Sequence, residues 1–350
     1  IGATFMYLQN YYMQNTPLGY DKDEIIITNM NNNIRKSRDA FASQVKSFSG
    51  IEEVTYAEML LSSQDQYMGW GRKYRDKDIQ FQCLPVESSF LKVMNVKISE
   101  GRDFREEDKA KRYGTFVFNE RARTEYGLEI GSLIDSMEIV GFMPDVKFAS
   151  FRTEVTPMAF FVWGTNNWGN QPNYAYIKVK AGSDLRGAMQ HVKTTLQSFD
   201  PEYPFNVRFF DEVLNGLYEK ERSLSSLITL FSLIAIFISV VGVFGLVVFD
   251  SEYRKKEIGI RKVLGSTTEE IIVMFNKTYI RILCVCFVLG APIAGYVVHR
   301  WLENFAYKTP MYWWVYLIAF AIIAVITILT VTFQNWRAAN ENPVHSIKNE

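Results

Sequence analysis

Residues 224–249 contain no Asp, Glu, Lys or Arg, which makes a run of 26 uncharged residues. As an α-helix this run would be about 39 Å long, and the hydrocarbon core of a bilayer is about 30 Å thick. A helix of this length on the surface of a soluble domain would show a polar face, and this run has none. We therefore expect it to cross a membrane.

Two further candidate spans follow the first. Residues 312–333 form a second uncharged run, of 22 residues. Residues 279–301 are also apolar, with Arg281 near one end and Arg300 near the other, where long side chains can reach the headgroups. The mean hydropathy of −0.05 hides these spans because the preceding part of the chain is polar.

Basic residues in the connecting loops predict the orientation. Residues 250–278 contain six Lys and Arg side chains, whereas residues 303–311 contain only Lys308. By the positive-inside rule, residues 250–278 and the tail at 334–350 are cytoplasmic. The part before the first span then lies outside the cytoplasm.

The N-terminal residues 1–8 are apolar and lead directly into polar residues. They are interpreted as the stub of a truncated transmembrane helix, and a short buried strand is the alternative. Residues 9–215 would then form the extracytoplasmic domain.

This domain is predicted to belong to the α+β class, because a strand–helix–strand order occurs near both of its ends. The expected elements are at 23–28, 31–48 and 51–56, and again at 174–180, 184–199 and 205–210. Two such units far apart in sequence predict a split βαβ sandwich of the ferredoxin-like type.

An inserted α+β subdomain is predicted at about residues 85–170. Strands are expected at 115–118 and 136–142, with a short helix starting at Asn119. After the domain, a helix capped by Asp211 is expected to continue into the first span, giving a stalk and transmembrane helix over 211–249. Such a helix can transmit motion as a rod; an ordinary packed helix fits the sequence equally well.

Several functional classes are disfavoured by composition. The 38 basic and 38 acidic side chains leave no net charge for binding nucleic acid. No HExxH, GxxxxGK[ST] or GxSxG motif occurs, so we predict no catalytic, cofactor or metal site in this chain. The three histidines are His191, His299 and His345.

Small residues recur on the first span at intervals of three and four. Such a stripe allows two helices to approach closely in a membrane. The predicted helix-packing residues are Ser232, Ala235, Ser239 and Gly242.

The cytoplasmic loop contains the most informative motif. It has an apolar Ile-Gly-Ile knob between charged residues, then a glycine that ends the turn and a Ser/Thr cap for the next helix. An exposed apolar knob at the membrane surface fits a groove on a partner, and a turn packed on its own helices is the alternative. The residues concerned are Glu257, Ile258, Gly259, Ile260, Arg261, Lys262 and Gly265.

Residues 254–266, RKKEIGIRKVLGS, resemble the cytoplasmic loop signature of FtsX-like and MacB-like ABC transporter permeases. Residues 336–348, WRAANENPVHSIK, resemble the closing motif of that family. Residues 101–104 (GRDF), 118–120 (FNE) and 139–141 (IVG), the last with Asp145, resemble the MacB-like periplasmic core domain. The resemblance covers essentially the whole chain.

This resemblance implies a multi-pass protein of the inner membrane with a large periplasmic domain between the first and second of four spans. Residues 1–8 would be the end of the first span, and the chain would be the second unit of a two-unit protein. Residues 257–262 would contact an ABC ATPase subunit, and ATP and Mg²⁺ would bind to that partner. The implied further partners are a second permease half or a second copy, a periplasmic adaptor or envelope protein, and membrane lipids.

The sequence thus predicts a permease subunit that transmits ATP-driven motion to its periplasmic domain, for export or for mechanical control of the envelope. The alternative is a membrane-anchored sensor or scaffold that regulates an envelope partner. A sensor would need an output domain, and the 17 residues at 334–350 are too few for one. An enzyme is a distant third hypothesis, and the sequence does not name a cargo.

Overall fold

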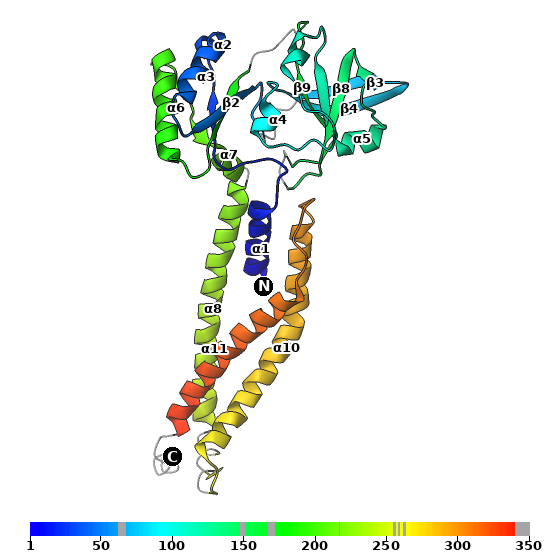
Figure 1. Cartoon of the computed structure of the whole chain (residues 1–350). Helices are drawn as coiled ribbons and strands as arrows, with labels where there is room; N and C mark the ends of the chain where they lie inside the picture. Colours follow the sequence, from blue (N-terminus) through cyan, green and yellow to red (C-terminus); the bar gives the residue numbers. More distant parts are fainter. Residues whose placement is uncertain are drawn as a thin grey trace. The chain divides into compact units, whose positions relative to one another are not determined.

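The computed structural model describes residues 1–61, 68–147, 151–166, 172–216, 218–254, 257, 260–261 and 264–339. The chain forms two compact units, and Figure 1 labels the α-helices and several of the strands. One comprises residues 16–219. The other comprises residues 1–15 and 220–350.

The first unit contains a four-stranded sheet in the order β11-β1-β10-β2, in which all neighbours are antiparallel. Each pair of sequential strands, β1–β2 and β10–β11, is connected through helices and separated by a strand of the other pair. This is the split βαβ arrangement, so the ferredoxin-like prediction is confirmed. The strands are β1 (Ile25–Asn29), β2 (Ile51–Ala57), β10 (Tyr174–Val179) and β11 (Arg208–Phe209).

Three helices pack on this sheet: α2 (Asn32–Lys36), α3 (Arg38–Lys46) and α6 (Leu185–Phe199). In α6, Ala188, Val192 and Leu196 recur every four residues and are fully buried against the sheet. The single helix expected at 31–48 is broken at Ser37, where the backbone leaves the helical region.

A second sheet, of seven strands, forms the inserted subdomain. Its order is β3-β4-β9-β6-β8-β5, and β7 pairs with β8. The strands are β3 (Met68–Tyr74), β4 (Lys77–Pro85), β5 (Glu100–Gly101), β6 (Thr115–Asn119), β7 (Leu133–Ile134), β8 (Met137–Met143) and β9 (Met158–Val162). The helices are α4 (Phe90–Val93), the 3-10 helix η1 (Glu106–Ala110) and α5 (Glu120–Tyr126).

The strands expected at 115–118 and 136–142 and the helix from Asn119 are confirmed as β6, β8 and α5. The predicted start of the subdomain near residue 85 is wrong. The hairpin β3–β4 belongs to the same sheet, because β4 pairs in parallel with β9, with Gln82 opposite Met158. The subdomain therefore includes residues from 68 onward.

Successive side chains along these strands point to opposite faces of the sheet, and they form a hydrophobic core on each face. Val117 and Phe160 face a cluster that includes Tyr176 of the first sheet. Their neighbours Phe116 and Phe161 face an aromatic cluster together with Trp70. The first cluster joins the two sheets, and the second belongs to the subdomain alone.

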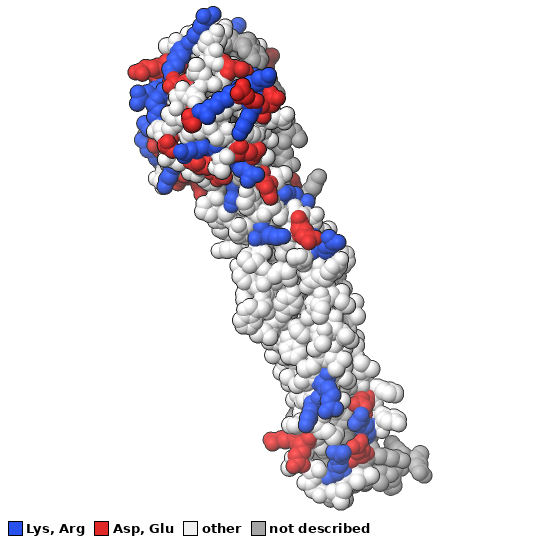
Figure 2. All heavy atoms as spheres, turned by 90° about the vertical axis from the view of Figure 1, so that its right-hand side faces the viewer, with Lys and Arg blue, Asp and Glu red and all other residues white. Residues whose placement is uncertain are grey.

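The second unit is helical, with α1 (Gly2–Asn15), α8 (Glu219–Tyr253), α10 (Thr268–Leu302) and α11 (Trp313–Ala339). Among the described residues, three segments are long and apolar enough to span a bilayer: Glu221–Asp250, Thr268–Leu302 and Trp313–Trp336. The three predicted spans are therefore confirmed by length and composition. On the face shown in Figure 2, the middle of this helical unit is an uncharged band, with Lys, Arg, Asp and Glu side chains at both of its ends.

Residues 2–8 belong to a helix, α1, rather than to a strand. The helix continues to Asn15, so the domain boundary predicted at residue 9 lies seven residues further on. Phe5 packs with Val298 and Val315, which places α1 among the helices of the second unit.

The continuous stalk helix predicted over 211–249 is not observed. Helix α7 (Phe210–Gly216) ends at a glycine, and α8 begins at Glu219. Tyr218 between them lies in a turn, where its hydroxyl accepts a hydrogen bond from the Phe151 N–H at 3.3 Å. Gly216 has low helix propensity and favours such an ending.

Candidate coupling loop

The loop between α8 and α10 contains the predicted coupling residues. Glu257, Ile260, Arg261 and Gly265 are described by the structure. Ile258, Gly259 and Lys262 lie outside the described residues.

An ion pair joins the two charged residues on either side of the apolar knob. The Arg261 guanidinium donates to the Glu257 carboxylate at 2.7 Å, one helical turn away. Its second terminal nitrogen lies 3.0 Å from the Met274 sulfur of α10. An exposed pair of this kind adds only about 0.3–0.5 kcal/mol, so its main effect is to fix the position of Arg261 against α10.

The loop leads into α10 through a glycine and a capping box. Gly265 has φ +98°, a conformation that side chains disfavour, as expected for the predicted end of the turn. The Thr267 hydroxyl accepts from the Glu270 N–H, and the Glu270 carboxylate accepts from the Thr267 N–H. The cap predicted within residues 266–268 is thus formed by Thr267.

Two apolar side chains of the loop are exposed. Ile260 is 57% exposed and Leu264 is 79% exposed, and the Leu264 N–H bonds to the Ile260 carbonyl within one helical turn. Their spacing of four places them on one side of that turn. This exposure fits a knob that docks on a partner better than a turn packed on its own helices.

The loop is anchored at its start by contacts that sequence reasoning missed. Arg254 pairs with Asp250 at 2.9 Å, and its guanidinium lies 5.8 Å from the ring centre of Phe275. Phe275 belongs to a small core that joins α8, α10 and α11 through Val247 and Val331. The spacing of four between Asp250 and Arg254 was the available signal.

The predicted helix-packing stripe has no partner helix within the described part of the chain. Ser232 is half-buried, whereas Ala235, Ser239 and Gly242 are exposed. The Ser239 hydroxyl donates to the Ala235 carbonyl of its own helix at 2.8 Å. The role of the stripe in helix packing therefore stays a prediction.

No group of three or more His, Cys, Asp and Glu side chains suited to a metal ion occurs among the described residues. Of the cysteines, Cys83 is buried in the inserted subdomain, and Cys284 and Cys286 lie exposed on α10. The described loop thus has the groups of a docking surface, namely apolar side chains and an ion pair.

Two family models together match most of the chain. Residues 8–195 match the MacB-like periplasmic core domain, which is more than half of the chain. Residues 229–343 match the FtsX-like permease C-terminal domain, and this range includes most of the first span, the loop, and the second and third spans. The chain belongs to the FtsX-like, MacB-like permease family. It is a membrane protein of the ABC transporter permease family with a periplasmic domain.

Individual proteins that are similar to this chain share low sequence identity with it. The macrolide export ATP-binding/permease protein MacB of Chromobacterium violaceum is 23% identical over 230 residues, covering 63% of this chain and 35% of that protein. MacB of Escherichia coli K12 is 23% identical over 233 residues, with the same coverage. The chain thus spans about a third of the length of these relatives.

Solved structures of related domains are also similar to this chain. The periplasmic region of MacB from Actinobacillus actinomycetemcomitans gives a TM-score of 0.41 at 13% identity, covering 57% of this chain and 95% of that one. The extracellular domain of the Gram-positive ABC-type transporter YknZ gives 0.37 at 12% identity, covering 53% and 99%.

Proposed function

We propose that this chain is a permease subunit of the inner membrane that couples ATP hydrolysis in a separate ABC ATPase subunit to motion of its periplasmic domain. ATP and Mg²⁺ bind to that partner in this proposal, and the chain itself performs no reaction. The observation that carries the proposal is the exposed pair Ile260 and Leu264 in an anchored loop of an FtsX-like permease.

The loop contacts suggest how force enters the membrane helices. A partner that moves Ile260 also moves Arg261, which contacts Met274 in the first turns of α10. Arg254 connects the other end of the loop to Phe275 on the same helix. Both ends of the loop thus act on α10, which supports transmission through this helix.

Helix α10 connects two packed clusters. Near its start, Ile271 and Phe275 pack with α8 and α11, and near its end Val298 and Leu302 pack with Phe5 of α1. At 35 residues, α10 is about 52 Å long. It replaces the continuous stalk of the sequence interpretation as the element that relays motion across the membrane. From family membership we also expect a second permease half or a second copy, and a periplasmic adaptor, as partners.

Co-purification from native membranes tests the proposal. The full-length protein is isolated in mild detergent, and the chains that accompany it are identified together with their ATPase activity. We expect a stoichiometric ATP-binding chain with the wild type, and its loss with Ile260→Asp, because a charge cannot be buried in an apolar groove without a partner.

Ile130→Asp is the matched control, since Ile130 is an exposed isoleucine of the other compact unit. This variant should retain the ATP-binding chain. Absence of such a chain from the wild-type preparation, or its retention by Ile260→Asp, would contradict the proposal.

A further inference from the structure

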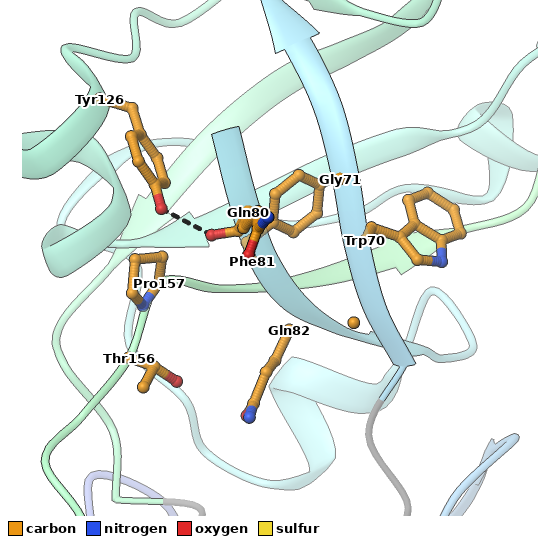
Figure 3. Close-up of a pocket in the computed structure, with 9 residues that line it drawn as sticks. Trp70, Gly71, Gln80, Phe81, Gln82, Tyr126, Thr156 and Pro157 are labelled. Carbon is orange, nitrogen blue, oxygen red and sulfur yellow. Dashed lines mark hydrogen bonds between the residues drawn. The ribbon is translucent and has the colours of Figure 1, made fainter. Parts of the chain in front are cut away.

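The inserted subdomain contains a cavity of about 540 Å³ above the hairpin β3–β4, within the range of small-ligand sites. The floor of this cavity is main chain. Trp70 and Phe81 border it, but their side chains are buried in the aromatic core on the opposite face of the hairpin. Figure 3 shows the Trp70 indole on the far side of β3 from Tyr126.

Two glycines keep the floor flat. Gly69 and Gly71 alternate on the cavity side of β3, and no atom of the described residues lies within 4 Å of where a Cβ would stand. Glycine inside a strand weakens the strand and often marks a close approach by a ligand. Nothing within the described chain makes that approach here.

Neutral polar side chains stand around this floor. Gln80 lies opposite Gly71 and Gln82 opposite Gly69 in the hairpin register, so the glycines leave both amides room. Neither side-chain amide, nor the Thr156 hydroxyl, has a hydrogen-bond partner among the described residues. Each free amide supplies two donors and one acceptor.

A fixed aromatic wall closes one side. The Tyr126 hydroxyl donates to the Gln80 carbonyl at 2.6 Å, which holds the ring beside Pro157 (Figure 3). The ring face is weakly negative and attracts the C–H groups of a ligand. Among the described residues, no Lys, Arg, Asp or Glu lines the cavity, so this lining offers a charged ligand no ion pair.

From this arrangement we infer that the cavity binds an uncharged saccharide. A sugar ring is flat enough to lie on the glycine floor, its C–H face suits the Tyr126 ring, and its hydroxyls both donate and accept as the free amides require. An extended peptide is the less suitable ligand, because strand addition needs the hydrogen-bonding edge of a sheet and this floor is a face. The inference goes beyond the proposed coupling function and does not depend on it.

Binding is measured on the full-length protein in lipid nanodiscs free of glycoside detergents, which would compete for the cavity. The probes are cellobiose and N,N′-diacetylchitobiose, observed by saturation-transfer NMR and titration. N-acetyl-trialanine amide is the peptide comparison. We expect saturable binding of at least one disaccharide and none of the peptide.

Variants locate the site. Gly71→Val should weaken saccharide binding at least tenfold by filling the floor, and the strand has open space for this side chain. Gln82→Ala should weaken it about two- to tenfold through lost hydrogen bonds. Gln190→Ala, an exposed glutamine of α6, should leave it unchanged. Thermal unfolding confirms that each variant is folded.

Three results would overturn the inference. The first is no saturable binding of either disaccharide to the wild type. The second is binding that a folded Gly71→Val variant retains. The third is binding of the blocked peptide while the saccharides give no signal, which would assign the cavity to a peptide instead.

Discussion

At the scale of single residues, Gln9 makes two buried contacts that hold α1 to the loop after α10. Its amide nitrogen donates to the Tyr307 carbonyl at 3.0 Å, and its amide oxygen accepts from the Thr309 N–H at 2.8 Å. The side chain is fully buried. One glutamine side chain thus bonds to a backbone carbonyl and to a backbone N–H.

Replacement of Gln9 by Leu should therefore lower stability by about 2–4 kcal/mol, because two buried hydrogen bonds to the backbone are lost. Thermal denaturation of the detergent-solubilised protein measures the loss. Tyr7→Leu, at an exposed position of the same helix, is the control and should change little. Equal stability of the Gln9→Leu and Tyr7→Leu variants would show that the contacts are unimportant.

Asp108 plays a comparable role in the periplasmic domain. Its side chain is 1% exposed and accepts two hydrogen bonds from Arg102 at 2.8 Å and one from the Arg105 N–H at 2.8 Å. Burial opposes its ionisation, but these bonds and Lys111 outweigh burial and lower the pKa of the carboxyl. Arg102 belongs to the GRDF motif, whose role here is structural.

A lowered carboxyl pKa means that the stabilisation is present above the ordinary Asp range and is lost as the pH falls through the folded-state pKa. Asp108→Asn should therefore destabilise the protein by about 2–4 kcal/mol at pH 7, and the difference from wild type should shrink in acid. Glu107→Gln, an exposed neighbour, is the control. Denaturation followed from pH 7 to pH 3 checks this, and a difference that does not change with pH would refute the ionic origin.

At the scale of elements, we expect a substitution in the coupling loop to change function much more than stability. The Glu257–Arg261 pair is exposed, so Arg261→Glu should change stability by less than about 0.5 kcal/mol. The same change removes the contact with Met274. It should reduce severalfold the extent to which this chain stimulates the ATPase activity of the partner. The exchange variant Glu257→Arg/Arg261→Glu keeps the pair but moves the cation, and recovery of stimulation would show that the pair itself is sufficient. If the Arg261→Glu variant stimulates the partner's ATPase activity normally, the Arg261–Met274 contact has no role in coupling.

Elements with strong local patterns could be predicted from sequence. Charge-free runs predicted the spans, and the helix expected at 184–199 is confirmed as α6. The hairpin β3–β4 was missed although Ile79, Phe81 and Cys83 alternate, because Gly69 and Gly71 weaken the strand pattern. Its pairing with β9, 70 or more residues away, has no local signal.

The candidate site was predicted only in part. The apolar knob, the Gly265 turn and the cap follow from residue types at short spacing. The contacts of Arg261 with Met274 and of Arg254 with Phe275 depend on how α10 packs beside the loop, which the sequence does not specify. The ending of α7 at Gly216 was overlooked because one glycine in a helical pattern is often tolerated.

At the scale of the whole molecule, we propose that α10 relays motion across the membrane. Its two ends belong to different packed clusters, one beside the coupling loop and one beside α1. Pro292 interrupts the helix hydrogen bonding between them and is a point where α10 can bend. Motion at the loop should therefore appear at residues 303–311, which follow α10.

A spin label at Lys308, an exposed residue of that segment, tests this most directly. Cys83, Cys284 and Cys286 are replaced by Ser or Ala, Lys308→Cys is labelled, and spectra of the complex with its ATPase are compared without nucleotide and with ATP and vanadate. The account predicts an ATP-dependent change in the Lys308 spectrum that Ile260→Asp abolishes. ATP hydrolysis by an intact complex with no change at Lys308 would contradict it.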